Sequence, residues 1–185
     1  SVFREKVIQL KDYPLIPYLR GDYLISKWSL DKENSNLQNN IKAFIGKHSN
    51  QVVSRRMRLN WLNYLASRNL NKTFHDYYQP GFGKKIDCKS EEFKLQKSDH
   101  SKKLNNDLLK QIESLWLVGT SLPNSCDGMI KEWSQFSYPN KAQLEQRVLL
   151  ALENKQKRLA KYLTKQIVKL DPSYTPPKVL FSKTP

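Results

Sequence analysis

The side chains that could do chemistry in this 185-residue chain are few and stand apart from one another. His48, His75 and His100 show no His-x-x-x-His or Glu-x-x-His spacing, so they predict no metal site and are interpreted as surface residues. Cys88 would need a nearby histidine and a lowered thiol pKa to act as a nucleophile, and the sequence indicates neither. The sequence therefore predicts no metal and no cofactor.

Two common catalytic motifs are also missing from the sequence. The segment Gly81-Phe82-Gly83-Lys84 has neither the spacing of a phosphate-binding loop nor a strand before it. A Gly-x-Ser-x-Gly nucleophile elbow does not occur. The pattern therefore favours a binding or structural role for this chain.

Charge is the strongest chemical feature of the chain. Thirty-two Lys and Arg residues stand against 17 Asp and Glu, which gives a net charge of +15. Such a surface attracts polyanions: nucleic acid, anionic lipid head groups or acidic cell-wall polymers. Arg55, Arg56 and Arg58 lie close together beside the polar strip of a predicted helix, and they form a candidate polyanion or glycan surface. The alternative is that the lysines only solvate exposed helix faces.

The chain has two cysteines, Cys88 and Cys126. Their number alone allows either a disulfide or two free thiols. Composition and spacing do not decide between these two states.

Composition favours an all-α fold. There are six glycines, few β-branched runs, and many Leu, Lys, Gln and Asn residues. Hydrophobic residues make up 38% of the chain and aromatic residues 11%, which argues against disorder. No apolar run reaches the roughly 18–20 residues that a membrane-spanning helix needs.

Hydrophobic periodicity predicts about nine short helices joined by short connections. Residues 1–12 form a short helix or lead-in, and 79–85 form a break. The predicted fold is a superhelical stack of antiparallel helices, an α-solenoid, over residues 1–170, followed by a Pro-rich tail or linker at 171–185. The expected helices are 14–29, 35–48, 51–68, 71–78, 88–97, one from about 104 to 117, one containing Met129 to Trp133, 140–153 and 155–169.

The corner between the sixth and seventh of these helices is the most distinctive stretch, SLWLVGTSLPNSCDGMIKEW at 114–133. Gly119 is expected to adopt a left-handed conformation at the end of the first helix. Asn124 or Ser125 is expected to cap the next one. All four tryptophans fall on apolar helical faces and are predicted to lie in the core.

Two segments resemble a known family. LKDYPLIPYL at 10–19 is similar to a segment near the mature N-terminus of soluble lytic murein transglycosylases. LWLVGTSLPNSCDGMIKEW at 115–133 resembles a second segment of that family. The two segments follow each other in the family's order, about a hundred residues apart. The chain departs from the family after Cys88, where it is more charged, and residues 97–106 look lengthened.

The resemblance implies the first part of the family's superhelical, U-shaped helical region, without a catalytic segment. In the family a separate lysozyme-like domain cleaves peptidoglycan between N-acetylmuramic acid and N-acetylglucosamine, forming a 1,6-anhydro product. The expected partners are then peptidoglycan glycan strands and that catalytic domain. The resemblance also implies a periplasmic location and a disulfide between Cys88 and Cys126.

Glu113-Ser114 superficially resembles the pair around the general acid of lysozyme-like transglycosylases. Such an acid needs a desolvated pocket, and the accompanying Gly-Leu-Met-Gln segment is nowhere in the chain. We interpret Glu113 as structural. The predicted function is a non-catalytic scaffold that guides peptidoglycan, and the alternative is a basic helical module that binds nucleic acid or an acidic protein.

Overall fold

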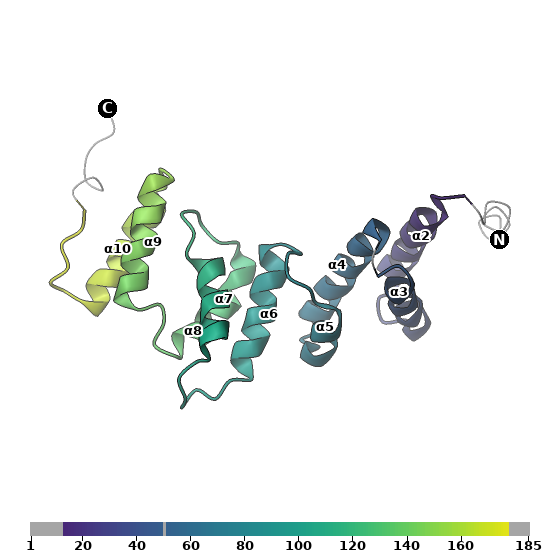
Figure 1. Ribbon diagram of the computed structural model, residues 1–185, viewed down its shortest axis with the longest axis horizontal. Coiled ribbons are helices and arrows are strands. Elements are labelled where there is room, and N and C mark those ends of the chain that lie inside the picture. The colour runs from purple at the N-terminus through teal and green to yellow at the C-terminus, as the bar shows by residue number, and fades with distance from the viewer. Residues whose placement is uncertain (1–12, 50, 178–185) are drawn as a thin grey trace. The chain divides into compact units, whose positions relative to one another are not determined.

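The structure is a computed structural model that describes residues 13–49 and 51–177. Over these residues the regular structure consists of α-helices and one 3₁₀ turn, without a strand, so the predicted all-α class is confirmed. The chain divides into two compact units, which we call the N-unit, up to Tyr77, and the C-unit, from Tyr78 (Figure 1). The predicted lead-in at 1–12 and the end of the predicted tail lie outside the described residues.

The N-unit is built of four helices that pack on their neighbours in sequence. Its core is aromatic: the ring centroids of Trp28 and Trp61 are 5.8 Å apart, and the ring of Tyr64 stacks on Trp61 at 5.3 Å. Phe74 closes the core from the last helix. The helices are α2 (Ile16–Leu30), α3 (Ser35–Lys47), α4 (Val52–Ser67) and α5 (Asn71–Tyr77).

The C-unit contains five α-helices and a 3₁₀ turn, as far as the structure describes it. A single hydrophobic cluster runs from Cys88 on the first of these helices to Ile167 on the last. Trp116 and Trp133 are buried in it, as predicted. The elements are α6 (Lys84–Gln96), α7 (Asn106–Trp116), η1 (Asn124–Cys126), α8 (Asp127–Ser134), α9 (Lys141–Glu153) and α10 (Lys157–Leu170).

Helix α6 differs most from its prediction. It begins at Lys84 rather than at 88, directly after Gly83, whose φ of 100° suits a residue without a Cβ atom. Two of its acidic residues, Glu91 and Glu92, are buried rather than solvated. The carboxylates can be buried because each one pairs with a lysine three residues away on the same helix. The sequence alone, rich in charge, predicts a polar helix instead.

Two helix starts also differ from their predictions. Helix α2 begins at Ile16, with Leu15 at the N-cap, and not at Pro14. For helix α4 the sequence predicts a cap at Ser49 or Asn50. The N-cap is instead Gln51, without a side-chain hydrogen bond, so Ser49 does not cap the helix, and Asn50 lies outside the described residues. Cap positions shift easily by one or two residues because several polar side chains compete for the same backbone groups.

The first part of the predicted tail is attached to the C-unit. Lys141 donates to Asp171 at 2.6 Å, directly after the end of α10. The ring of Tyr174 packs partly buried against the hydrophobic cluster. The prolines end the helix as predicted, but the chain beyond it still contributes contacts.

Candidate functional site

The corner between α7 and α8, residues 117–126, contains Gly119, Asn124, Ser125 and Cys126, which the sequence singled out. Helix α7 ends when the amide of Leu117 donates to the Glu113 carbonyl at 2.7 Å. The chain then crosses to η1, where the amide of Cys126 donates to the Pro123 carbonyl at 2.9 Å. No side-chain cap precedes η1 or α8, so the prediction of a cap at Asn124 or Ser125 is wrong: the backbone bond of the 3₁₀ turn takes that place.

Gly119 is required here for a reason other than the predicted one. Its φ is not positive, so it is not a left-handed helix end. A Cβ atom at this position would lie 2.2 Å from Nδ2 of Asn154 and 2.3 Å from the carbonyl oxygen of Leu150. The end of α9 therefore approaches the corner so closely that only glycine fits.

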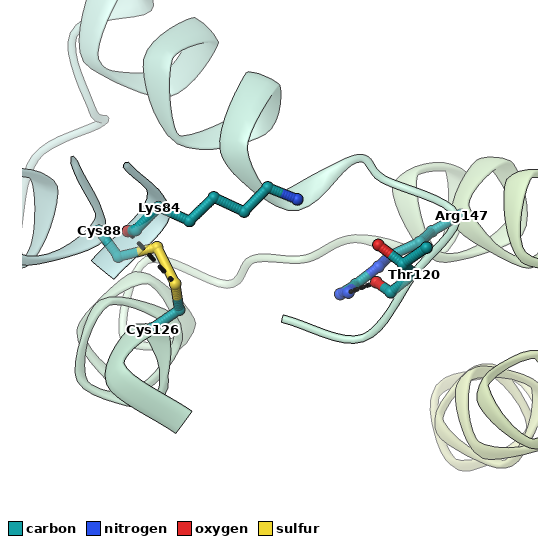
Figure 2. The surroundings of a disulfide bond; sticks show 5 residues. All are labelled: Lys84, Cys88, Thr120, Cys126 and Arg147. Atoms are coloured by element: carbon teal, nitrogen blue, oxygen red, sulfur yellow. Dashed lines mark hydrogen bonds between the residues drawn. A yellow bond between two sulfur atoms is a disulfide. The ribbon is translucent and has the colours of Figure 1, made fainter. Parts of the chain in front are cut away.

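A disulfide joins the corner to α6, as the family resemblance implied. The sulfur atoms of Cys88 and Cys126 are 2.03 Å apart, the Cα atoms are 5.1 Å apart, and both residues are fully buried (Figure 2). The Cys126 sulfur also lies 3.8 Å from the carbonyl oxygen of Lys84. We treat this as a packing contact, because a disulfide sulfur carries no hydrogen to donate.

Helix α6 also meets the start of α8 through a second glycine. A Cβ atom on Gly128 would lie 2.3 Å from Oε2 of the buried Glu92. Glu92 is held in place by Lys89 at 2.7 Å. A carboxylate beside the first turn of a helix also interacts favourably with the helix dipole. The corner is thus fixed to α6 by a covalent bond and by a close polar contact.

Arg147 of α9 supports the corner from the other side, and the sequence analysis did not single it out. Its guanidinium is 4.4 Å from the ring centroid of Trp116 and donates to the carbonyl oxygen of Val118 at 3.3 Å. It also donates to the carbonyl oxygen of Thr120 at 3.4 Å (Figure 2). The residue is only 5% exposed. Burial lowers its pKa to about 10.

Buried arginines usually pair with carboxylates, and Arg147 instead binds two backbone carbonyls and an aromatic face. These partners are not visible in a sequence pattern, because they belong to an irregular segment that lies 27 to 29 residues earlier. The arrangement orients the corner and presents no charged group to solvent.

Glu113 is also engaged in packing. Its side chain accepts a hydrogen bond from Gln143, a buried residue of the capping box at the start of α9. Gln143 bonds the backbone of Asn140 in the same motif. The carboxylate therefore ties α7 to α9, which agrees with its structural interpretation.

The structure separates the three predicted arginines of α4. Arg55 and Arg56 are exposed, and Arg56 forms an ion pair with Asp22 at 2.8 Å. Arg58 is 7% exposed, and its Nη2 atom lies 3.5 Å from the carbonyl oxygen of Ser49. Two of the three side chains can thus reach a partner in solution.

A hollow of about 310 Å³, with several polar side chains in its lining, lies beside α6 and α7 in the C-unit, and sequence reasoning missed it. Its polar groups bond one another: Tyr78 donates to Asp87 at 3.0 Å, and Lys94 contacts both Glu91 and Gln111. Burial, with the nearby Asp87 carboxylate, raises the pKa of Tyr78. The sequence signal that could have indicated this hollow is the Tyr-x-Pro-Gly turn before α6, which is interpreted only as a break between helices.

The described residues contain neither a metal site nor a membrane-spanning helix. Within 13–49 and 51–177, no group of three His, Cys, Asp or Glu side chains is arranged to hold a metal ion. Among the same residues, none of the helices is long and apolar enough to cross a membrane.

Comparison with solved structures gives clear matches. An inactive mutant of the lytic transglycosylase Slt from Pseudomonas aeruginosa matches with a TM-score of 0.74 and 28% sequence identity, covering 89% of this chain and 25% of that one. The 70 kDa soluble lytic transglycosylase from Escherichia coli matches with a TM-score of 0.69 and 22% identity, again covering 89% and 25%. A complex of the 70 kDa soluble lytic transglycosylase with bulgecin A gives 0.70 and 23%, covering 90% of this chain and 25% of that one.

This chain therefore spans about a quarter of the length of the structures that it matches. No protein-family model and no curated protein matches its sequence. The fold match extends over both units and agrees with the two sequence segments that resemble soluble lytic transglycosylases. In fold and in these two segments, the chain is similar to a helical region of Slt-type lytic transglycosylases.

Proposed function

We propose that the chain is a non-catalytic scaffold of a periplasmic lytic murein transglycosylase, which holds a lysozyme-like catalytic domain and guides anionic peptidoglycan strands to it. The observation that carries this proposal is the use of the family-like segment at 115–133. Its cysteine forms the disulfide, its Gly119 admits α9, and its tryptophans fill the core. On this proposal the segment maintains the shape of the helical region.

The periplasmic location is supported by the buried disulfide. Such bonds persist in oxidising compartments and are rare in the cytosol. We expect thiol titration of the native, unreduced protein to detect no free thiol. Two titratable thiols under denaturing conditions without reductant would contradict both the disulfide and the location.

Incubation with purified murein sacculi tests the scaffold role. We expect the 185-residue chain to sediment with sacculi and to release no 1,6-anhydro products. Products should appear when a lysozyme-like catalytic domain of the same parent protein is added. Release of 1,6-anhydro products by the chain alone would overturn the non-catalytic proposal.

Guidance of glycan strands is tested at the exposed arginines of α4. The double variant Arg55→Gln/Arg56→Gln should bind sacculi several-fold more weakly than the unchanged chain. The matched control removes two exposed lysines of the C-unit, Lys97→Gln/Lys103→Gln, with the same change in net charge. Equal losses in the two variants would show that only net charge matters and would remove the arginines as a specific surface.

The second candidate, a module that binds nucleic acid or an acidic protein, is favoured by the net charge of +15. Binding to phosphates releases counterions, so the logarithm of the affinity for DNA should fall linearly and steeply with the logarithm of salt concentration. A tight, salt-dependent DNA complex combined with no binding to sacculi would replace the scaffold proposal.

A further inference from the structure

Helix α10 carries the densest net positive charge of the helices in the described part of the chain. Its 14 residues, KRLAKYLTKQIVKL, include no Asp or Glu. We call its basic side chains the α10 ridge: Lys157, Arg158, Lys161, Lys165 and Lys169.

These side chains share one face of the helix. At roughly 100° per residue, the α10 ridge covers an arc of about 120°. The buried residues Ala160, Leu163 and Ile167 lie on the other side, where α10 packs against α9 (Figure 1). Tyr162, 60% exposed, and Val168, 38% exposed, lie within or beside the basic arc. The outward face therefore combines cations with an aromatic ring and an aliphatic side chain.

The positive charge of this face is not neutralised by neighbouring acids. Within 13–49 and 51–177, no salt bridge joins a ridge residue to a carboxylate. The nearest acids in sequence are Glu153, at the end of α9, and Asp171, whose carboxylate bonds Lys141 and Ser173. The lysines recur every four residues, and like charges at this spacing destabilise a helix.

Their spacing makes the ridge residues act together. Four helical residues correspond to about 6 Å along the axis, which is shorter than the screening length of about 8 Å at physiological salt. A surface with several negative groups in one plane can therefore engage the whole ridge at once. A glycan strand presents acidic groups separated by uncharged sugar rings, so it would meet only some of these cations.

We propose that the α10 ridge docks the protein on the surface of an anionic lipid bilayer. Clusters of four to eight basic residues on an amphipathic helix are typical of binding to anionic lipids. Tyr162 and Val168 fit the boundary between head groups and acyl chains, and lysine stems can extend along it. The apolar face of α10 is already buried in the core, so the helix binds as a preformed, peripheral element. This inference is independent of the scaffold proposal.

Vesicle cosedimentation tests the proposal with the whole 185-residue chain. One set of vesicles contains phosphatidylcholine alone, and the other contains phosphatidylcholine and phosphatidylglycerol in a three-to-one ratio. The ridge variant is Arg158→Gln/Lys161→Gln/Lys165→Gln/Lys169→Gln, which preserves helix propensity and leaves the core untouched. The matched control removes four exposed lysines from four other helices: Lys47→Gln, Lys72→Gln, Lys110→Gln and Lys131→Gln.

The unchanged chain should bind the anionic vesicles and not the zwitterionic ones. The ridge variant should bind the anionic vesicles roughly 100- to 1,000-fold more weakly, since each of its four removed basic residues contributes about a factor of five near the surface. The control variant should lose far less, because its lysines are distributed over separate faces. Tyr162→Ala should weaken binding several-fold and leave its dependence on salt unchanged.

Three results would overturn the inference. Equal losses in the ridge and control variants would show that net charge alone attracts the protein. Unchanged vesicle binding by the ridge variant, with thermal unfolding like that of the parent chain, would exclude the ridge as the lipid surface. Loss of sacculus or DNA binding with no vesicle binding by either protein would assign the ridge to a glycan or nucleic-acid partner.

Discussion

In the N-unit, Trp28, Trp61 and Tyr64 pack ring against ring. Its helices α2 to α5 are held by apolar packing and a few polar contacts, such as the ion pair of Arg56 with Asp22, without a disulfide. In the C-unit, Trp116 and Trp133 also meet, with ring centroids 5.5 Å apart. There, however, the core also encloses a disulfide and the guanidinium of an arginine. The two units thus use the same kind of aromatic core with different reinforcements.

The two units differ in reinforcement because they differ in the segments that connect their helices. The helices of the N-unit follow one another through short connections of a few residues, so side-chain packing with a few polar contacts defines their positions. The C-unit contains the corner at 117–126. Residues 117–123 of this corner are irregular, and their backbone groups find no partners in a regular helix. Arg147, the disulfide and two close glycine contacts supply those constraints. Reinforcement is concentrated where regular secondary structure is missing.

Replacing the central tryptophan of the N-unit should have the largest effect. Trp61→Ala removes a side chain that is 1% exposed, and large-to-small changes of this kind cost about 3–5 kcal/mol in the free energy of unfolding. Hydrogen exchange followed by mass spectrometry should show faster exchange in α2 to α5 and little change in α6 to α10. Equal acceleration in both units would contradict their description as separate compact cores.

Removing the disulfide should produce the complementary result. Cys88→Ala/Cys126→Ala opens a loop closed across a separation of 38 residues. In the chain-entropy model this costs about 4 kcal/mol of unfolding free energy. The same exchange measurement should now show acceleration in α6 to α10 and little in the N-unit. A reductant added to the unchanged chain is the control and should act in the same direction.

Two glycine-to-alanine changes test whether Gly119 is required because α9 approaches it closely. Gly46, which has no close neighbour, is the comparison. Gly119→Ala must displace Asn154 and the backbone of Leu150, and such overpacking costs about 1–3 kcal/mol. Gly46→Ala, in α3, meets no atom within 4 Å and should raise stability by up to about 1 kcal/mol through helix propensity. Denaturant midpoints measure both changes. An unchanged denaturant midpoint for Gly119→Ala would mean that the end of α9 can move away from the corner without loss of stability.

The smallest expected effect concerns the attachment of the segment after α10. Hydrogen bonds from Lys141 and Ser173 lower the pKa of Asp171 from 3.8 to about 2. A carboxylate with a lowered pKa stabilises the fold above its ordinary pKa and loses this contribution as the pH falls through the lowered value. Asp171→Asn should therefore be slightly less stable than the parent at neutral pH, with the difference vanishing towards pH of about 2.

Urea unfolding at several pH values measures this difference. The effect should be small, because the Asp171 carboxylate is only partly buried and ion pairs at the surface are screened by solvent. Asp76→Asn, at an exposed position of the N-unit, is the control. A stability difference that persists at the lowest pH would show that Asp171 acts through something other than its charge.

Much of the helical pattern could be predicted from the sequence. Helices α3, α5 and α9 occur within a residue or two of their expected bounds, because apolar residues recur there at helical spacing between polar breaks. The burial of all four tryptophans followed from the same periodicity. The start of α6 did not, since its charged sequence resembles a solvated segment until the ion pairs on the helix are known.

The sequence by itself determined the all-α class, the apolar faces of the helices and, through two family-like segments, the cysteine pair. These properties depend on local periodicity or on a long, specific pattern. Only the tertiary structure decided why Gly119 is a glycine, what Arg147 binds, and that Arg58 is buried while Arg55 is exposed. Each of these depends on atoms distant in sequence that approach within a few ångströms, and local spacing carries no information about such contacts.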